Sequence, residues 1–408
     1  MHMSWVGARL SAGRNLFALA LLVGTLQVVA PAADSATLDC QDRGRTATPT
    51  TGAVFNDPTG KVADQYRIIQ AVVHDINGTP RGEDIRIATL AIEARSVVDA
   101  LTAAHRCGVH VRVLVPGRAW DDNAVVSLRN ALGTDRSRSS WITRCDGSCT
   151  SDGDAGIMHV KSYLFSEVRG VRDVTIYSSG NLTQGQARTR WNDAYQLVGN
   201  PDVYSSATRF FDSMTRNTRT SFPRLTKADG YWQYYFPSGR NFHLDVLDAT
   251  RCHLASGATK IDFVASIWKE ADVAEKLADL RDAGCDIRVV VSLDKVEQPV
   301  LHALRARGVP THVQSADGPV GSTHSKYIAI RGEHDGYIVR TVYCGSLNVS
   351  GFSVGTANNN MFRIVDDRTA YAAYDREFDR LWDDSRPLDR ADVKNAGRVD
   401  ARTAEMQD

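Results

Sequence analysis

The sequence lacks the residue clusters that usually hold a metal ion. Its 408 residues contain no His-x-x-x-His pair, no cluster of aspartates and no acidic loop with the spacing of a calcium site. Carboxylate, imidazole and thiolate groups at such spacings are what divalent cations require as ligands. We therefore expect chemistry that needs neither a metal ion nor another cofactor.

The chain also lacks net charge. Lysine and arginine together number 48, and so do aspartate and glutamate, so the formal net charge at pH 7 is zero. This balance does not favour a dedicated nucleic-acid-binding protein, which is usually basic. The fractions of 43% apolar and 24% charged residues are typical of a globular protein. A chain of 408 residues exceeds what one hydrophobic core usually serves, so we expect two domains or two fused repeats.

The N-terminal apolar run is short for a membrane span. Leu16–Val29 falls below the roughly 20 residues that a spanning helix needs, and polar residues interrupt it. Arg9 and Arg14 precede the run, and Ala30-Pro31-Ala32 offers a small-x-small cleavage site. This pattern favours a cleaved secretory signal over an anchor. We therefore predict that residues 1–32 are a signal peptide and that the protein is secreted.

Cysteine is sparse, with seven residues in the whole chain. An exported protein can form disulfides, and Cys145 and Cys149 could close a tight local loop. The same pair could be half of a zinc site, but no second Cys or His pair lies at ligand spacing. The disulfide is therefore favoured, and the odd count leaves at least one cysteine unpaired within the chain.

What the sequence does contain is a short pattern that occurs twice. Each copy is a His-x-Lys on an apolar run, followed by two asparagines at fixed distances. The spacing from the first copy to the second is 165 residues for His and Lys and 167 for both asparagines, and the two extra residues fall in the turn at 332–336. Random recurrence would not produce this agreement. The residues are His159, Lys161, Asn181 and Asn192 in the first copy and His324, Lys326, Asn348 and Asn359 in the second.

The pattern indicates an anion site built from both copies. In a strand, residues two apart point to the same face, so each His-x-Lys places an imidazole beside an ammonium. The first asparagine of each copy joins them if the two strands of the copy form a hairpin. Two copies facing each other would surround a tetrahedral phosphate with cationic groups and amide donors. One imidazole could then attack phosphorus while the other protonates the leaving oxygen.

Each half of the chain also contains the elements of a β-α-β unit, which implies parallel strands joined by a crossover helix. The expected elements are a helix over Asp64–Ile76, a strand over Ile85–Ala91, a helix over Glu93–Arg106 and a strand over Val109–Val115 in the first half, and a helix over Phe242–Leu254, a strand over Lys260–Ala265, a helix over Glu270–Ala283 and a strand over Asp286–Val291 in the second.

Matched elements with matched polar motifs indicate gene duplication and pseudo-two-fold symmetry. We therefore expect an α/β protein with a first half over residues 33–228, a second half over 229–385 and a polar tail over 386–408.

A basic and aromatic segment joins the two halves. Ser213–Ala228 contains Arg216, Arg219, Arg224 and Lys227 without an acidic residue, and Tyr231–Phe236 follows. It could form a lip that engages phosphate head groups or an interface. The plainer interpretation, which we prefer, is a solvated linker that leads into a buried strand.

The duplicated motif resembles that of the phospholipase D superfamily, which carries H-x-K-x4-D twice, each followed by G-[GS]-x-N. The resemblance extends over both halves and implies two similar α-β-α halves with mixed sheets, related by a pseudo-two-fold axis. It further implies that His159 forms a phosphohistidine and that His324 acts as acid and then base, although the symmetry leaves the reverse open. Lys161, Lys326, Asn181 and Asn348 would hold the phosphate oxygens.

Two departures from the family pattern stand out. The motif Asp is replaced by Ser166 in the first copy and by Arg331 in the second. Many relatives have a carboxylate that orients the nucleophilic histidine, and Asn192 and Asn359 stand at that place. The orienting group would then be one of these amides or the adjacent Asp193.

Two serines of the repeated elements are further candidates for substrate binding. Ser179 and Ser346 could donate hydrogen bonds to phosphate, or they could be turn hydroxyls that satisfy their own backbone.

These features predict a secreted phosphodiesterase. The expected reaction converts a glycerophospholipid at a membrane surface to phosphatidate and a free alcohol, and transfer to an acceptor alcohol is possible. A secreted metal-independent endonuclease is the first alternative, because phosphate chemistry alone does not choose the ester. A catalytically weakened lipid- or phosphate-binding homologue is the second. We expect no obligate protein partner.

Overall fold

The computed structural model describes residue 40, residues 47–150, 156–218, 225–254 and 257–397, residue 400 and residues 403–404. The expected signal peptide, residues 1–32, lies outside the described residues. Within the described part of the chain, no helix combines the length and the apolar character needed to cross a membrane.

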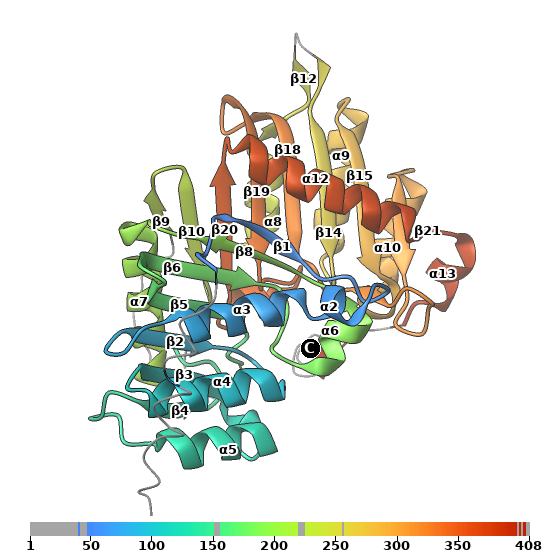
Figure 1. The fold of residues 1–408 in the computed structure, drawn as a ribbon. Helices are drawn as coiled ribbons and strands as arrows, with labels where there is room; N and C mark the ends of the chain where they lie inside the picture. The colour runs from blue at the N-terminus through green and yellow to red at the C-terminus, as the bar shows by residue number, and fades with distance from the viewer. Residues whose placement is uncertain are drawn as a thin grey trace, which may run out of the picture.

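The first half is built on a seven-stranded mixed sheet with the order β1-β8-β6-β5-β2-β3-β4. The strands β2, β3 and β4 run parallel, and the others pair antiparallel. The strand bounds are β1 Gly52–Phe55, β2 Asp84–Ala88, β3 His110–Pro116, β4 Trp141–Cys145, β5 Ser162–Val168, β6 Val171–Ser178 and β8 Asp193–Leu197. Figure 1 shows helices α3, α4 and α5 on one side of this sheet. The helix bounds are α2 Val62–Gln65, α3 Arg67–Gly78, α4 Arg95–Arg106, α5 Asn123–Leu132, α6 Gln184–Thr189 and α7 Pro201–Thr215.

The second half repeats this plan in a ten-stranded sheet. Its path runs β21-β16-β15-β14-β18-β19-β20-β10-β9, with β11 paired to β18. The strand bounds are β9 Leu225–Ala228, β10 Tyr231–Tyr235, β11 Thr250–Arg251, β14 Lys260–Ala265, β15 Asp286–Ser292, β16 Thr311–Gln314, β18 Tyr327–His334, β19 Tyr337–Gly345, β20 Asn360–Val365 and β21 Arg386–Pro387. The helix bounds are α8 Phe242–Asp248, α9 Ala271–Asp282, α10 Gln298–Ala306, α11 Gly351–Gly355, α12 Arg368–Asp383 and α13 Arg390–Asn395. Two short strand pairs complete the fold, β12 His253–Leu254 with β13 Gly257–Ala258 and β7 Arg190–Trp191 with β17 Ser322–Thr323.

The two sheets have the same internal order. The strands β10-β20-β19-β18-β14-β15-β16 of the second sheet occupy the places of β1-β8-β6-β5-β2-β3-β4 in the first. The expected fold class, two similar α/β halves with mixed sheets, is therefore confirmed. In both halves the His-x-Lys motif leads into the strand at the centre of the sheet, which is β5 or β18.

The hairpins that follow the motifs are as expected. β5 pairs antiparallel with β6, and β18 pairs antiparallel with β19. Both hairpins have a two-residue turn, at 169–170 and at 335–336, and each strand of the second hairpin is one residue longer. The expectation that the two inserted residues fall in a turn at 332–336 is therefore wrong in detail, because residues 332–334 belong to β18. Each hairpin brings the end of its second strand, where Asn181 or Asn348 follows, back to the level of the motif.

Most expected elements lie within two or three residues of their predicted bounds, but the helix predicted over Phe242–Leu254 is wrong in its second half. The helix ends at Asp248 because the chain then turns to pair with the second sheet, where Thr250 aligns with His334 in β18. The disulfide between Cys252 and Cys285 fixes this departure from the helix. Helical periodicity could not reveal a strand pairing made with residues about 80 positions away.

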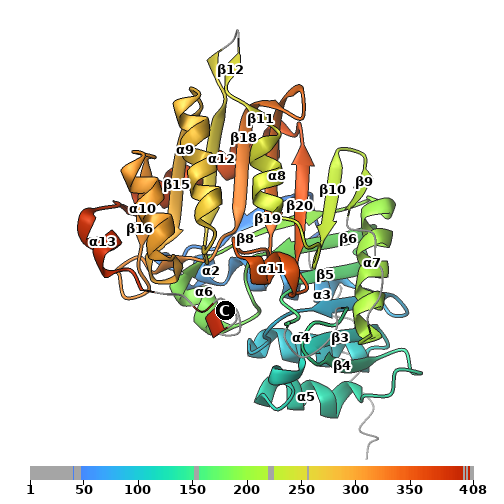
Figure 2. The same cartoon turned by 180° about the vertical axis from the view of Figure 1, so that it is seen from behind.

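One hydrophobic cluster is shared by the two halves, and each half also has a cluster of its own. Tyr177 and Tyr195 of the first sheet pack on Phe362 of the second, with ring centroids 5.0 and 5.8 Å apart. Apolar residues of α7 and α12 complete this cluster, and α12 lies across one face of the second sheet while α8, α9 and α10 lie on the other (Figures 1 and 2). Because buried aromatic area is shared between the halves, their relative position is fixed by packing.

The second sheet extends beyond the expected boundaries of its half. β9 pairs with β10 although it lies before residue 229, and β21 pairs with β16 although it lies beyond residue 385. α13 packs against α10, so the first part of the expected polar tail belongs to the second half.

Six of the seven cysteines form disulfides. The pairs are Cys40–Cys107, Cys145–Cys149 and Cys252–Cys285, and Cys344 is a buried free thiol. The predicted local bridge between Cys145 and Cys149 is confirmed, as is the expectation that one cysteine remains unpaired.

Candidate functional site

The two His-x-Lys segments lie just before the central strands rather than on them. β5 begins at Ser162, one residue after Lys161, and β18 begins at Tyr327, one residue after Lys326. The expectation that the motifs stand within strands is therefore wrong in detail. The reason is that each segment leaves its own sheet and hydrogen-bonds to the other half of the chain.

The backbone contacts show this exchange. The His159 N–H donates to the Asn358 carbonyl at 2.9 Å, and the His324 N–H donates to the Trp191 carbonyl at 2.7 Å. Met158 forms a parallel bridge with Asn358, and β17 pairs in parallel with β7. Each motif is thus held by the segment that carries the second asparagine of the other copy, and the two motifs converge at the junction of the halves.

Both imidazoles are oriented across the junction in the same way. The distance from His159 Nδ1 to Asn359 Oδ1 is 2.8 Å, and that from His324 Nδ1 to Asn192 Oδ1 is also 2.8 Å. An amide oxygen can only accept, so each Nδ1 carries the proton and donates. The remaining nitrogen, Nε2, is then the one available for chemistry on each ring.

Asn192 and Asn359 therefore occupy the place of the orienting carboxylate, each acting on the histidine of the opposite half. Sequence spacing pointed to these two asparagines, but it did not reveal that they exchange partners.

The two lysines stand beside their histidines. Lys161 Nζ lies 2.9 Å from His159 Nε2 and 3.1 Å from the His159 carbonyl oxygen, and Lys326 Nζ lies 2.7 Å from the His324 carbonyl oxygen. The exposed fraction is 0% for His159 and Lys161, 1% for His324 and 3% for Lys326. Two ammonium groups buried this deeply are costly unless an anion compensates them. The arrangement therefore fits a site that binds a negatively charged group.

The first asparagines of each copy are buried at the same junction. Asn348 lines a small cavity together with Lys326, and its Oδ1 accepts from the Ile267 N–H at 3.4 Å. Its Nδ2 is buried and makes no hydrogen bond within the described part of the chain, so this amide has a donor available for an anion. Asn181 follows Gly180, where an added Cβ would lie 2.8 Å from Asn192 Oδ1. Asn181 is therefore next to the group that orients His324.

Ser179 and Ser346 bond within the protein. The Ser179 hydroxyl accepts from the Asp193 N–H at 2.9 Å, and the Ser346 hydroxyl donates to Asn359 Oδ1 at 2.9 Å. Ser346 also accepts from the Asn360 N–H at 3.1 Å. These contacts support the interpretation that the hydroxyls of Ser179 and Ser346 satisfy the local backbone. Ser346 also holds the side-chain amide of Asn359, which orients His159.

Asp193 does not orient either imidazole. Its carboxylate accepts from the Tyr374 hydroxyl at 3.2 Å and from the Lys326 N–H at 3.4 Å, and it is 1% exposed. Burial raises the pKa of Asp193 to about 6, and its hydrogen bond with Ser179 and the nearby Lys326 oppose this rise. At its pseudo-symmetric place the second half has the neutral Asn360. The negative charge thus lies behind the second motif only.

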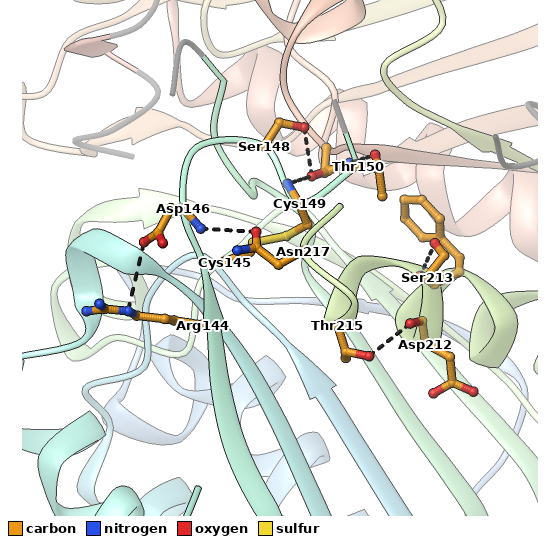
Figure 3. Close-up of a disulfide and its surroundings, with 12 residues drawn as sticks. Arg144, Cys145, Asp146, Ser148, Cys149, Thr150, Asp212, Ser213, Thr215 and Asn217 are labelled. Atoms are coloured by element: carbon orange, nitrogen blue, oxygen red, sulfur yellow. Dashed lines mark hydrogen bonds and ion pairs between the residues drawn. A yellow bond between two sulfur atoms is a disulfide. The ribbon is translucent and has the colours of Figure 1, made fainter. Parts of the chain in front are cut away.

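Asn358 was missed by the sequence reasoning, although it stands next to Asn359. Its side-chain oxygen accepts from the Cys149 N–H at 2.6 Å, and its side-chain nitrogen donates to Thr150 Oγ1 at 2.6 Å. It is wholly buried, and its carbonyl holds the backbone of His159. The disulfide loop, residues 145–149 (Figure 3), therefore helps to position the first motif. A side-chain bridge over about 200 residues leaves no signal in the spacing.

Ser166 and Arg331, which replace the motif aspartate, contribute to the fold rather than to the site. The Ser166 hydroxyl donates to Glu83 at 2.6 Å and accepts from the Asp84 N–H at 2.7 Å, which ties β5 to the start of β2. Arg331 is exposed and pairs through its backbone with Lys260 in β14. Neither residue contacts the imidazoles. Among the described residues, no group of three or more His, Cys, Asp or Glu side chains could hold a metal ion.

Comparison with known proteins identifies the family to which both halves belong. A family model described as "Cardiolipin synthase, PLD-like domain" matches residues 72–215 and 251–382, which are the two halves. No curated protein sequence is similar to the chain.

Solved structures share the fold at low sequence identity. Phosphatidylserine synthase from Haemophilus influenzae Rd KW20 is 10% identical with a TM-score of 0.56, covering 92% of this chain and 96% of that one. Polyphosphate kinase from Porphyromonas gingivalis is 16% identical with a TM-score of 0.54 and covers 82% of this chain, which spans only 50% of the kinase.

Proposed function

The chain belongs to the phospholipase D superfamily, whose members act on phosphodiester bonds, and from this premise we propose that it is a secreted phospholipase D that hydrolyses glycerophospholipids. The observation that carries the proposal is the reciprocal pair of imidazole–amide contacts, because it aligns two buried histidines at one anion site. The products are phosphatidate and a free alcohol, and an acceptor alcohol can replace water in the second step.

The reaction proceeds in two steps at phosphorus. His159 Nε2 attacks the phosphate and forms a P–N bond, while the bond to the leaving oxygen breaks and His324 Nε2 donates its proton to that oxygen. His324 then removes a proton from water, whose oxygen attacks phosphorus and releases His159. Lys161, Lys326 and the amide donor of Asn348 oppose the charge on the non-bridging oxygens in both transition states.

The asymmetry at Asp193 supports this division of labour. The acid must begin the reaction as an imidazolium, and a nearby carboxylate stabilises that cation. Asp193 lies behind the motif of His324 and interacts with Lys326, whereas the neutral Asn360 lies at the equivalent place behind His159. At the same time, Lys161 Nζ donates to Nε2 of His159, which requires an unprotonated nitrogen there. These two contacts support the assignment of His159 as the nucleophile and His324 as the acid.

Export and a lipid substrate rest on further support. Three disulfides in the described part of the chain are typical of proteins that leave the reducing cytosol. The description of the matching family model names cardiolipin synthase, an enzyme that makes a lipid. The chain has a formal net charge of zero and therefore lacks the excess of basic residues that binding of long nucleic acids needs.

The proposal is tested by giving the purified protein two substrates in EDTA. Phosphatidylcholine vesicles report choline release, and supercoiled plasmid reports nicking. We expect choline release that persists in EDTA and disappears in His159→Ala and in His324→Ala, while both variants keep the wild-type circular dichroism spectrum. Nicking without choline release would favour the endonuclease, and activity of either histidine variant would exclude the mechanism.

A further inference from the structure

Away from the paired histidines, arginine side chains gather around a cavity at the edge of the first sheet. The cavity has a volume of about 620 Å³. Its walls come from β3, from the loop before β4 together with the start of β4, and from the end of α7. We call it the arginine pocket, and its lining residues are Arg112, Arg136, Ser137, Arg138, Ser139, Trp141, Asp212, Thr215 and Arg216.

The arginine pocket concentrates positive charge. Four arginines face one aspartate, which gives the lining a formal charge of +3 from 4 − 1, whereas the whole chain has a formal net charge of zero. Asp212 does not cancel this excess, because its carboxylate also faces Arg86 at 3.9 Å, outside the lining. Such a local excess in a concave surface attracts anions.

Two of the arginines are held in place by the protein. Arg136 donates to Thr215 Oγ1 at 3.0 Å and lies over the ring of Trp141 at 5.4 Å from its centroid. Arg112 lies 3.5 Å from Asp84 and is paired in register with Trp141. These contacts fix the back wall of the pocket, so its guanidinium groups are ordered before a ligand binds.

The other two arginines have their charges available. Arg138 and Arg216 are exposed, and neither forms a close ion pair in the part of the chain that the structure describes, although the charge of Arg138 acts on the neighbouring carboxylate of Asp135. Arg216 was one of the basic residues noted between the halves, and Arg219 and Arg224 lie outside the described residues. A guanidinium binds phosphate with two parallel hydrogen bonds, so Arg138 and Arg216, which line the same pocket, can both donate to one bound anion.

We propose that the arginine pocket binds a phosphate monoester or inorganic phosphate at a site separate from the catalytic centre. A monoester has three terminal oxygens and nearly two negative charges at neutral pH, which matches a net lining charge of +3 better than the single charge of a diester does. Such a phosphate group occurs on small soluble phosphates and also on phosphatidate. Phosphatidate as the ligand rests on the proposed function, in which it is a product.

The arginine pocket is joined to the loop that supports the first motif. Trp141 is the first residue of β4 and Cys145 the last, so the pocket and the Cys145–Cys149 disulfide lie at opposite ends of one strand. Asn217, which follows Arg216, accepts from the Asp146 N–H at 3.3 Å, as Figure 3 shows. The ligand therefore binds at the far end of β4 from the disulfide loop, and none of the residues that line the pocket belongs to the two motifs.

Fluorine NMR of protein labelled with 5-fluorotryptophan tests the proposal, because one tryptophan reports on each site. Trp141 lines the pocket, and Trp191 precedes the Asn192 that orients His324. Titration with inorganic phosphate should shift the Trp141 signal in a saturable way. Arg138→Gln/Arg216→Gln should weaken this response at least about tenfold, since each loses a charge-assisted hydrogen bond.

The matched control is Arg305→Gln, which removes an exposed arginine from α10 and should leave the response unchanged. Absence of a Trp141 shift, or an equal response in wild type and in the double variant, would overturn the proposal. The Trp191 signal reports phosphate at the catalytic centre separately, so failure of one site is not mistaken for failure of the other.

A second arm identifies the source of the phosphate. Vesicles of phosphatidylcholine in which about one lipid in five is phosphatidate present a multivalent surface. They are sedimented with His159→Ala protein, so that turnover does not change them. Loss of vesicle binding on adding Arg138→Gln/Arg216→Gln identifies the lipid head group as the ligand. Unchanged vesicle binding, together with the phosphate-dependent Trp141 shift, identifies free phosphate instead.

Discussion

Replacing Asn359 with alanine removes the group that orients the nucleophile. The amide oxygen of Asn359 accepts from His159 Nδ1 at 2.8 Å, and its nitrogen donates to the Ser353 carbonyl at 3.2 Å. Without this acceptor the imidazole can rotate and change tautomer, so Nε2 no longer presents its lone pair to phosphorus. The first chemical step should therefore slow, while substrate affinity stays nearly unchanged.

The magnitude follows from the loss of one buried hydrogen bond. Such orienting partners contribute roughly 10- to 100-fold in activity, which corresponds to about 1.4–2.7 kcal/mol in the activation free energy. The free energy of unfolding should fall by about 1–3 kcal/mol, because the Ser353 carbonyl loses its donor. Asn359→Ala should therefore stay folded at 25 °C, with a lower kcat and a similar KM.

The assay compares Asn359→Ala with Asn192→Ala, its counterpart across the pseudo-symmetry. Asn192 orients His324, so its loss slows proton donation to the leaving oxygen. Phosphatidyl-p-nitrophenol has a leaving group that needs no proton, and stopped-flow absorbance follows the first turnover. Asn359→Ala should remain slow in this first turnover, whereas Asn192→Ala should recover to nearly the wild-type rate. A wild-type kcat for folded Asn359→Ala would refute the reasoning, and the opposite pattern would reverse the roles of the histidines.

Three further predictions concern the surroundings of the site. Burial raises the pKa of Asp193 from 3.8 to about 6, so between these pH values the folded state keeps a proton on Asp193 that the unfolded state has lost. The free energy of unfolding therefore falls as pH rises through this window, by about 3 kcal/mol once pH exceeds 6. Urea denaturation from pH 4 to 8 should show that Asp193→Asn is stabilised relative to wild type at pH 8 but not at pH 4, and parallel curves would contradict this. Gly180→Ala places a Cβ 2.8 Å from Asn192 Oδ1 and should lower kcat roughly tenfold with an unchanged circular dichroism spectrum; unaltered turnover would show that Asn192 can move without cost. Cys145→Ser/Cys149→Ser should lower the free energy of unfolding by about 2 kcal/mol, measured in urea, and should also lower kcat; loss of stability with full activity would show that the disulfide loop does not position the first motif.

The sequence reveals the parts of the fold that repeat. Strands and helices with clear apolar periodicity, such as Lys260–Ala265 and Glu93–Arg106, lie close to their expected places as β14 and α4. The duplicated spacing of His159 and His324 also predicted that two halves meet at one site. These features are local, or they depend on a pattern repeated within the chain.

What the sequence does not reveal depends on contacts between the halves. The exchange of Asn192 and Asn359 between histidines, and the support of His159 by Asn358, arise because each motif leaves its own sheet for the other half. The sequence distances between the histidine and the asparagines of one copy contain no information about this exchange. The arginine pocket was likewise invisible, since Arg112 and Arg216 come together only when α7 packs beside β4.

The most direct test is to trap the covalent intermediate. In His324→Asn the leaving p-nitrophenolate of phosphatidyl-p-nitrophenol still departs without an acid, but no base activates water for the second step. We predict a burst of about one equivalent of p-nitrophenol per chain and a phosphatidyl adduct on His159, found by mass spectrometry after an alkaline quench that preserves the P–N bond. The absence of an adduct, or an adduct on a residue other than His159, would contradict the account.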